Sequence, residues 1–342
     1  MARLERDQEP GVDEVVIQVS GCGVCHTDLG FYYEGVPTRH PLPLTLGHEI
    51  SGVVVEAGAE VQGWQGRAVV VPAVIPCGQC GACRSGHGSI CRAQIFPGND
   101  VHGGFASHVV VPAASLCPVP DLQDRACNPG ALELSTLSVI ADAVSTPYQA
   151  VLRSGLKAGD LAIFVGVGGV GGFGVQIAAA LGAHVVAIDI DPQPLAGVES
   201  CCVATFDAKA LDACAIKRSI KNIAKEYAVP TWRHRIFETS GSVQGQGTAF
   251  GLLSHASYLS LVGYSTKKVE LHLSKVMALD ATIQGNWGCL PKYYPEVLEM
   301  VLQGKIQIKQ HVVPRPLSSI NQCFAEIHAH QLHGRAILIP DM

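Results

Sequence analysis

The sequence predicts an α/β protein with two domains, one β-rich and one built on a doubly wound parallel sheet. Residues 1–120 hold short β-type runs separated by Gly- and Pro-rich turns, which is typical of an irregular, partly closed antiparallel barrel. From residue 160 onward, strand-like and helical segments alternate. This alternation predicts a parallel sheet covered on both faces. A chain of 342 residues is long enough for two separate cores.

The expected elements follow in chain order. Strand candidates of the first part are residues 15–20, 50–58, 68–75 and 106–113. Residues 131–152 have apolar positions at helical spacing, interrupted by Pro147. Strand candidates then recur at 161–166, 184–190, 235–241, 258–264 and 281–287, and a last one lies at 336–340. We therefore expect residues 1–146 and 285–342 to form one domain around an inserted domain of residues 147–284.

Composition excludes several classes of protein. Hydrophobic residues make up 48% of the chain and charged residues 15%, a balance that favours a packed globular protein over a disordered one. The net charge of −5, without a basic run, predicts no nucleic-acid partner. No apolar stretch is long enough to span a membrane, and the charged start MARLERDQEP does not resemble a secretory signal peptide. We expect a soluble cytoplasmic protein with no membrane partner.

Four of the thirteen cysteines lie within fifteen residues. Cys77, Cys80, Cys83 and Cys91 have the spacing C-x2-C-x2-C-x7-C. Four thiolates close a tetrahedral zinc shell and leave no position open for chemistry, so we predict a structural zinc site. The alternatives are free cysteines on a loop or an iron–sulfur cluster, although the fourth cysteine is not followed by the proline of a ferredoxin motif.

Polar residues in the apolar N-terminal part suggest a second, catalytic zinc. Cys25 offers a thiolate and His48 an imidazole, and a catalytic zinc needs a few protein ligands and one open position. Asp28 is suited to accept the second ring N–H of His48, and Glu49 could be a supporting or exchanging ligand. Taken singly, Cys25 and His48 could be ordinary packing residues.

A glycine-rich turn follows the strand candidate 161–166 and opens a helix. Its nucleotide-binding residues are Gly166, Gly168, Gly169, Val170 and Gly171. In G-x-G-x-x-G the glycines permit a tight turn and close approach of the backbone to a pyrophosphate, beside the positive end of the helix dipole. Asp189 ends the next strand candidate, where a carboxylate binds ribose hydroxyls and repels a 2′-phosphate. We therefore predict NAD as cofactor, with Asp191 a solvated loop residue.

The segments GCGVCHTDL, GHEISGVVVEAG and CGQCGAC resemble the zinc-containing medium-chain alcohol dehydrogenases over nearly the whole chain. The resemblance implies a GroES-like catalytic domain, a Rossmann domain, two zinc ions per chain and a homo-oligomer, either dimer or tetramer. It also implies that Cys25, His48 and a residue of the domain-joining helix hold the catalytic zinc. Many relatives have cysteine at that third position, and here Asp142 is the ligand-capable side chain that fits.

The same resemblance implies roles for residues around the zinc. His26 is expected near the pyrophosphate, and Arg335 is expected to contact it, although Arg335 could equally be a surface cation. Thr27 is expected to take the proton of the alcohol as hydride passes to NAD. Many relatives complete this proton relay with a histidine, whose place is held here by Gly30.

For the substrate, segments such as GFYYEGV and FPGNDVHGGFASHVVVPA resemble dehydrogenases of a cyclic allylic alcohol carried on coenzyme A, which act in anaerobic benzoyl-CoA degradation. This implies oxidation of a small-molecule CoA thioester to the ketone. Alternatives are a dehydrogenase of other secondary alcohols or polyols, a non-catalytic binding protein of the same fold, and an enoyl reductase. Phe31, Tyr32, Tyr33 and Trp287 are candidates for the pocket wall or for the core.

Overall fold

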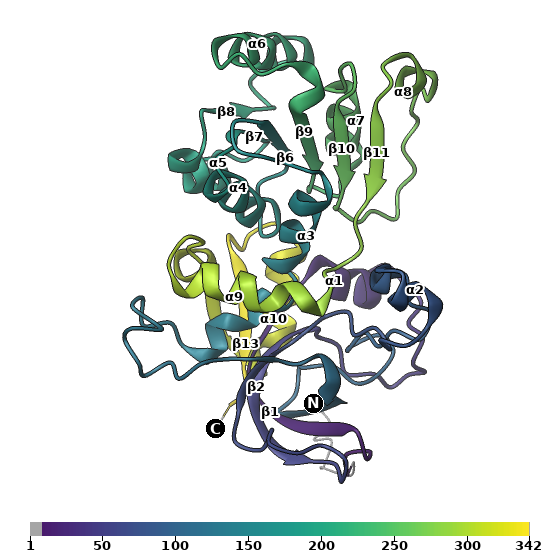
Figure 1. Cartoon of the computed structure of the whole chain (residues 1–342), viewed down its shortest axis with the longest axis vertical. Coiled ribbons are helices and arrows are strands. Elements are labelled where there is room, and N and C mark those ends of the chain that lie inside the picture. Colours follow the sequence, from purple (N-terminus) through teal and green to yellow (C-terminus); the bar gives the residue numbers. More distant parts are fainter. Residues whose placement is uncertain (1–8, 342) are drawn as a thin grey trace. The chain divides into compact units, whose positions relative to one another are not determined.

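The computed structural model describes residues 9–341 and divides into two compact units (Figure 1). The first unit comprises Met1–Ser145 and Gly288–Met342, and the second comprises Thr146–Trp287. The sequence prediction places the limits of the inserted domain at residues 147 and 284. Most of the charged N-terminal segment, from which we expect no signal peptide, lies outside the described residues.

The first unit is built on a seven-stranded sheet. Its strands are β1 (Glu14–Gly23), β2 (Glu49–Ala57), β3 (Ala68–Val71), β4 (His108–Pro112), β5 (Cys117–Pro118), β12 (Val312–Pro316) and β13 (Arg335–Ile339). They follow the order β12-β13-β1-β2-β3-β5, and β4 pairs with β1. Pairing is antiparallel except between β12 and β13. This parallel pair differs from the all-antiparallel expectation because a helix connects its strands, as parallel neighbours require.

Four α-helices lie wholly within the described part of the first unit. They are α1 (His26–Tyr33), α2 (Gly81–Arg84), α9 (Tyr294–Leu302) and α10 (Ile320–His328). Short 3₁₀ helices are η1 (Gly88–Ile90), η2 (Ala113–Ser115), η3 (Leu134–Ala141), η6 (Pro291–Tyr293), η7 (Lys309–His311) and η8 (Leu317–Ser319). Of these, η3 contacts β1, β2 and β3. This contact brings residues that follow position 140 next to residues 14–57.

The second unit has a six-stranded sheet in which every pair is parallel. Its strands are β6 (Leu161–Val165), β7 (His184–Asp189), β8 (Ala204–Asp207), β9 (His234–Glu238), β10 (Tyr258–Leu261) and β11 (Thr282–Gly285). Their order, β11-β10-β9-β6-β7-β8, is that of a Rossmann fold. The predicted fold class is thus confirmed. Strand β8 was not predicted from sequence, because it is only four residues long and half-buried.

Helices flank this sheet (Figure 1). They are α3 (Ser145–Arg153), α4 (Gly171–Ala180), α5 (Pro192–Val198), α6 (Ala213–Glu226), α7 (Val243–Gly251) and α8 (Ser274–Ala278), with the short η4 (Glu199–Cys201) and η5 (Thr231–Arg233). The helical stretch predicted at 131–152 is broken at Asp142 and not at Pro147. Pro147 lies in the first turn of α3, where its missing N–H leaves no helical hydrogen bond unmade. Within the described residues, no helix is both long and apolar enough to cross a membrane.

Candidate active site

The loop after β1 carries Cys25 into the interior of the first unit. Cys25 caps α1, and its backbone N–H donates to Asp28 Oδ2 at 2.9 Å. This bond fixes the start of the helix, because the first N–H groups of a helix have no partner inside it. Thr27 Oγ1 lies 3.6 Å from Cys25 Sγ. His26 opens the helix and is exposed to solvent.

His48 reaches the same place from the start of β2. Gly47, just before it, has φ of +98°, and a Cβ at that position would lie 2.8 Å from Cys22 Sγ. Only glycine can adopt this conformation without a clash at position 47. Asp28 Oδ1 accepts the N–H of Gly47 at 3.2 Å and lies 3.3 Å from His48 Nδ1. A single buried carboxylate thus lies between the two loops and close to the His48 ring.

Asp142 follows η3 and faces both of these side chains. Its Oδ2 lies 3.8 Å from Cys25 Sγ and 3.6 Å from His48 Nε2. A tetrahedral zinc with ordinary bond lengths gives a sulfur–oxygen separation of about 3.6 Å and a nitrogen–oxygen separation of about 3.4 Å. The two separations from Asp142 Oδ2 therefore lie close to those of a tetrahedral zinc shell. Burial lowers the pKa of His48, but the carboxylates of Asp28 and Asp142 raise it well above its usual value, so the site favours positive charge.

Glu49 and Arg335 form a buried ion pair next to this group. The Nε of Arg335 donates to Glu49 Oε2 at 3.0 Å, and a second guanidinium nitrogen donates to Oε1. Two parallel bonds of this kind are the strongest form of carboxylate recognition by arginine. Glu49, Cys25, His48 and Asp142 each offer a ligand atom within 4.8 Å of the others. Glu49 and Arg335 are 286 positions apart, and no pattern in the sequence links them.

Aromatic side chains near the site fall into two groups. Phe96 lies against the ring of His48, with centroids 4.8 Å apart, and Phe31 packs on the cluster that contains Phe96. Phe96 was missed in the sequence, where it is one aromatic residue among many. Tyr32 and Tyr33 contact Phe324 and His328 of α10. Trp287 belongs to the second unit, where its carbonyl accepts a bond from Gln149.

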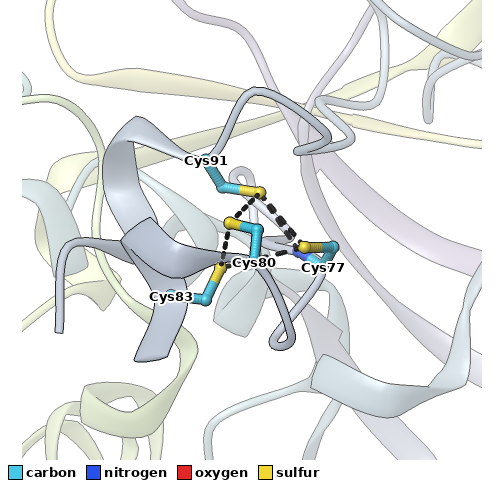
Figure 2. A group of neighbouring side chains, drawn as sticks. All are labelled: Cys77, Cys80, Cys83 and Cys91. Carbon is cyan, nitrogen blue, oxygen red and sulfur yellow. Dashed lines mark hydrogen bonds between the residues drawn. The ribbon is translucent and has the colours of Figure 1, made fainter. Parts of the chain in front are cut away.

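The four cysteines of the predicted structural site converge on one point (Figure 2). Adjacent sulfur atoms of Cys77, Cys80, Cys83 and Cys91 are 3.5–4.0 Å apart. A tetrahedron with zinc–sulfur bonds of about 2.3 Å has edges of about 3.8 Å. Backbone N–H groups of Gln79 and Cys80 lower the pKa of Cys77 to about 6, which favours the thiolate that binds metal. The four sulfur atoms are therefore spaced to bind one zinc ion tetrahedrally.

The glycine-rich turn joins β6 to α4 in the second unit. Gly166 has φ of +86°, and a Cβ there would lie 2.6 Å from the Cα of Ser240. At Gly171 a Cβ would lie 1.9 Å from a backbone oxygen, whereas at Gly168 it would meet nothing within 4 Å. Gly166 and Gly171 thus allow close packing of the turn against neighbouring backbone, and Gly168 leaves the backbone accessible to a ligand.

Asp189 ends β7 beside this turn. Its Oδ2 accepts the N–H of Val167 at 2.7 Å, and its Oδ1 accepts the N–H of Asp191 at 3.0 Å. The carboxylate is thereby held at the carboxyl edge of the sheet, where nucleotides bind in this fold. Asp191 itself caps α5 by accepting the N–H of Gln193, a structural role that the expectation of a solvated loop residue missed.

A Rossmann fold in a chain with two side-chain clusters that could each hold a metal ion is typical of a zinc-dependent dehydrogenase. Residues 11–121 match the alcohol dehydrogenase GroES-like domain, and residues 169–303 match the zinc-binding dehydrogenase domain. The chain belongs to the zinc-containing medium-chain alcohol dehydrogenase family. The predicted enzyme class and its zinc dependence are thereby confirmed.

Individual relatives align with this chain over more than nine tenths of their length. An alcohol dehydrogenase of Geobacillus stearothermophilus is 29% identical over 332 residues, which cover 96% of this chain and 92% of that one. The crystal structure of galactitol-1-phosphate dehydrogenase from Escherichia coli aligns with a TM-score of 0.86 at 26% identity, covering 99% of this chain and 96% of that one. The alcohol dehydrogenase of Aeropyrum pernix aligns with a TM-score of 0.84 at 27% identity and the same coverage.

Proposed function

We propose that Cys25, His48 and Asp142 hold the catalytic zinc of an NAD-dependent dehydrogenase of secondary alcohols, and that Cys77, Cys80, Cys83 and Cys91 hold a structural zinc. The observation that carries the first assignment is the convergence of a thiolate, an imidazole and a carboxylate whose measured separations are 3.6 and 3.8 Å. Three protein ligands leave one position for a substrate oxygen, whereas four thiolates leave none.

When bound, zinc supplies a Lewis acid for the alcohol oxygen, and NAD supplies the hydride acceptor. The chain contributes the groups around these cofactors. Thr27, 3.6 Å from the Cys25 sulfur, is the hydroxyl that takes the proton of the alcohol. Beyond Thr27 the usual histidine is replaced by Gly30, so the proton leaves through water or His26.

Glu49 has two roles open to it in this proposal. Its carboxylate is close enough to replace a zinc ligand, and its bonds to Arg335 hold it aside. We propose that Glu49 is an exchanging ligand and that Arg335, beside it, also binds the pyrophosphate of NAD together with His26. The guanidinium has five donors, and the pair with Glu49 uses two of them.

The cofactor preference rests on the turn that contains Gly166, Gly168, Gly169, Val170 and Gly171, and on Asp189. A carboxylate at the end of β7 accepts the ribose hydroxyls and repels a 2′-phosphate. Ile190 and Asp191 follow Asp189, so no adjacent arginine is present to neutralise such a phosphate. We therefore propose NAD in preference to NADP.

For the substrate we propose a cyclic allylic secondary alcohol carried on coenzyme A, 6-hydroxycyclohex-1-ene-1-carbonyl-CoA, which is oxidised to the 6-oxo product in anaerobic benzoyl-CoA degradation. The support is the sequence resemblance of GFYYEGV, FPGNDVHGGFASHVVVPA and GNWGCLPKYYPE to dehydrogenases of this substrate. The apolar group formed by Phe31 and Phe96 beside His48 suits a ring-shaped substrate body.

A polyol or polyol phosphate is the second candidate substrate. It is favoured by the alignment with galactitol-1-phosphate dehydrogenase over 99% of this chain. Steady-state oxidation of the CoA-linked cyclohexenol, free cyclohexenol, sorbitol and galactitol 1-phosphate, each with NAD and NADP, separates the two. A kcat/KM at least tenfold higher for the CoA thioester with NAD is expected. A higher value for any free alcohol or polyol would refute the CoA assignment.

We also propose that the protein is a homodimer or homotetramer, as the family resemblance implies. Strand β11 ends the second unit's sheet, and Leu273 and Met277 nearby in sequence are 70% and 77% exposed. An unpaired sheet edge and exposed apolar side chains both favour association. Mass measurement by light scattering tests this, and a monomer at micromolar concentration would refute it.

A further inference from the structure

The backbone just before Asp142 is held by side chains that the proposed reaction does not use. Asp142 has φ of −142° and ψ of −57°, so the 3₁₀ helix η3 ends at Ala141. The last carbonyls of a helix have no partner within it and need one elsewhere. The N–H of Val144 donates to Val139 at 3.0 Å, and this wide turn leaves the carbonyl of Ala141 directed at other parts of the first unit.

Three donors converge on the carbonyl oxygen of Ala141. The hydroxyl of Tyr294 donates to it, the hydroxyl of Ser145 donates at 3.2 Å, and the N–H of Ala73 lies at 3.4 Å. The N–H of Ala73 also donates to the Tyr294 oxygen at 3.2 Å. The tyrosine oxygen thus gives one hydrogen bond and receives another, and these two bonds join the end of η3 to the segment after β3.

Tyr294 is fully buried at the start of α9, and α9 contacts η3. Burying a hydroxyl costs free energy unless it is hydrogen-bonded. Two partners of this hydroxyl, the carbonyl of Ala141 and the N–H of Ala73, are backbone groups. The ring alone would fill the same space, so the hydroxyl has a use beyond packing.

We propose that Tyr294 is a positioning residue for the catalytic zinc, because it fixes the backbone from which Asp142 reaches the metal. The proposal rests on the assignment of Asp142 as a ligand. An aspartate has one methylene between its backbone and its carboxylate, so a shift of the Ala141–Asp142 peptide moves Oδ2 by a similar distance. Partners that orient metal ligands typically change metal affinity 10- to 100-fold when removed.

The test is release of zinc from the intact protein to a chromogenic chelator, followed over time. Tyr294→Phe removes the hydroxyl and keeps the ring. We expect the catalytic zinc of Tyr294→Phe to leave about tenfold faster than in the wild type, whereas the zinc of the four cysteines leaves at the wild-type rate. Ser145→Ala removes another donor to the same carbonyl and should change release of the catalytic zinc in the same direction by a smaller factor.

Tyr258→Phe is the matched control, since it removes a tyrosine hydroxyl that is hydrogen-bonded to Gln284 in the second unit. It should leave both release rates unchanged. Wild-type release from Tyr294→Phe overturns the proposal. Faster release of both zinc ions also overturns it, because the hydroxyl would then stabilise the unit as a whole.

Asp142→Asn distinguishes failure of the positioning role of Tyr294 from failure of the assignment of Asp142 as a zinc ligand. If Asp142→Asn retains both zinc ions at wild-type rates, Asp142 is not a ligand and both proposals fail. If Asp142→Asn loses one zinc and Tyr294→Phe behaves as the wild type, only the positioning role fails. Faster release from Tyr294→Phe alone would mean that Tyr294 acts without Asp142, which overturns the inference as stated.

Discussion

The two proposed metal sites of the first unit differ in how far apart along the chain their ligands lie. Cys77, Cys80, Cys83 and Cys91 all come from one loop of fifteen residues. The proposed ligands of the catalytic site come from three segments, and Cys25 and Asp142 are 117 positions apart. A local site can be recognised from spacing, whereas a dispersed site exists only when the sheet and η3 bring its segments together.

The two sites also differ in what surrounds the ligands. The cysteine loop uses its own backbone N–H groups to favour the thiolate of Cys77. The proposed catalytic site is stabilised by hydrogen bonds between distant segments. Asp28 links two loops, and Tyr294 lies 153 positions from the carbonyl to which it donates. The following predictions test this contrast, from the largest expected effect to the smallest.

Loss of the local site should unfold its surroundings. We expect Cys91→Ser to bind one zinc per chain instead of two and to lose about 4 kcal/mol or more of unfolding free energy, because a structural metal contributes directly to folding. Metal analysis and denaturant unfolding measure both. Cys127→Ser, an exposed cysteine outside either site, is the control. Two zinc ions and wild-type stability in Cys91→Ser would contradict the structural assignment.

Loss of the dispersed site should instead abolish activity with little change in stability. Asp142→Ala is expected to retain only the structural zinc and to lose about 10³-fold in kcat, equivalent to about 4 kcal/mol of transition-state stabilisation. Asp121→Ala removes an exposed carboxylate of the same unit and should change neither quantity. An unchanged stoichiometry of two zinc ions in Asp142→Ala would rule out Asp142 as a ligand.

Removing the proton acceptor should separate chemistry from metal binding. Thr27→Val keeps the shape of the side chain and lacks the hydroxyl, so kcat should fall about 10²-fold, the lower range for general acid–base groups, with both zinc ions retained. Thr27→Ser keeps the hydroxyl and should stay within a few-fold of the wild type. Equal activity of Thr27→Val and Thr27→Ser would exclude the relay role.

The smallest effect is expected at the carboxylate that orients His48. Asp28→Asn should weaken binding of the catalytic zinc about 10- to 100-fold, because an oriented imidazole binds metal better. The zinc affinity of the cysteine loop should stay unchanged. Competition with a chelator of known affinity measures both constants in one sample. An equal loss at both sites would point to general destabilisation of the unit.

Most of the secondary structure could be predicted, because its signals are local. The apolar runs that became β1, β2, β6 and β7 lie where the sequence predicts them. The helical stretch near residue 140 was predicted to break at Pro147, the residue with the strongest breaking tendency. It breaks at Asp142, because burial of η3 on the sheet and the bonds to the Ala141 carbonyl determine the turn. Half-buried β8 had no clear pattern to reveal it.

The sequence by itself determined the features whose parts are neighbours in the chain. These are the four-cysteine loop and the glycine-rich turn, whose chemistry follows from their spacing. The class of enzyme followed from the resemblance of these and neighbouring segments to a known family. Only the tertiary structure decided which distant groups share a site: the pair of Glu49 with Arg335, the contact of Phe96 with His48, and the bond of the Tyr294 hydroxyl to the Ala141 carbonyl. Such contacts depend on sheet register and helix packing between segments that are distant in the chain, which no local pattern encodes.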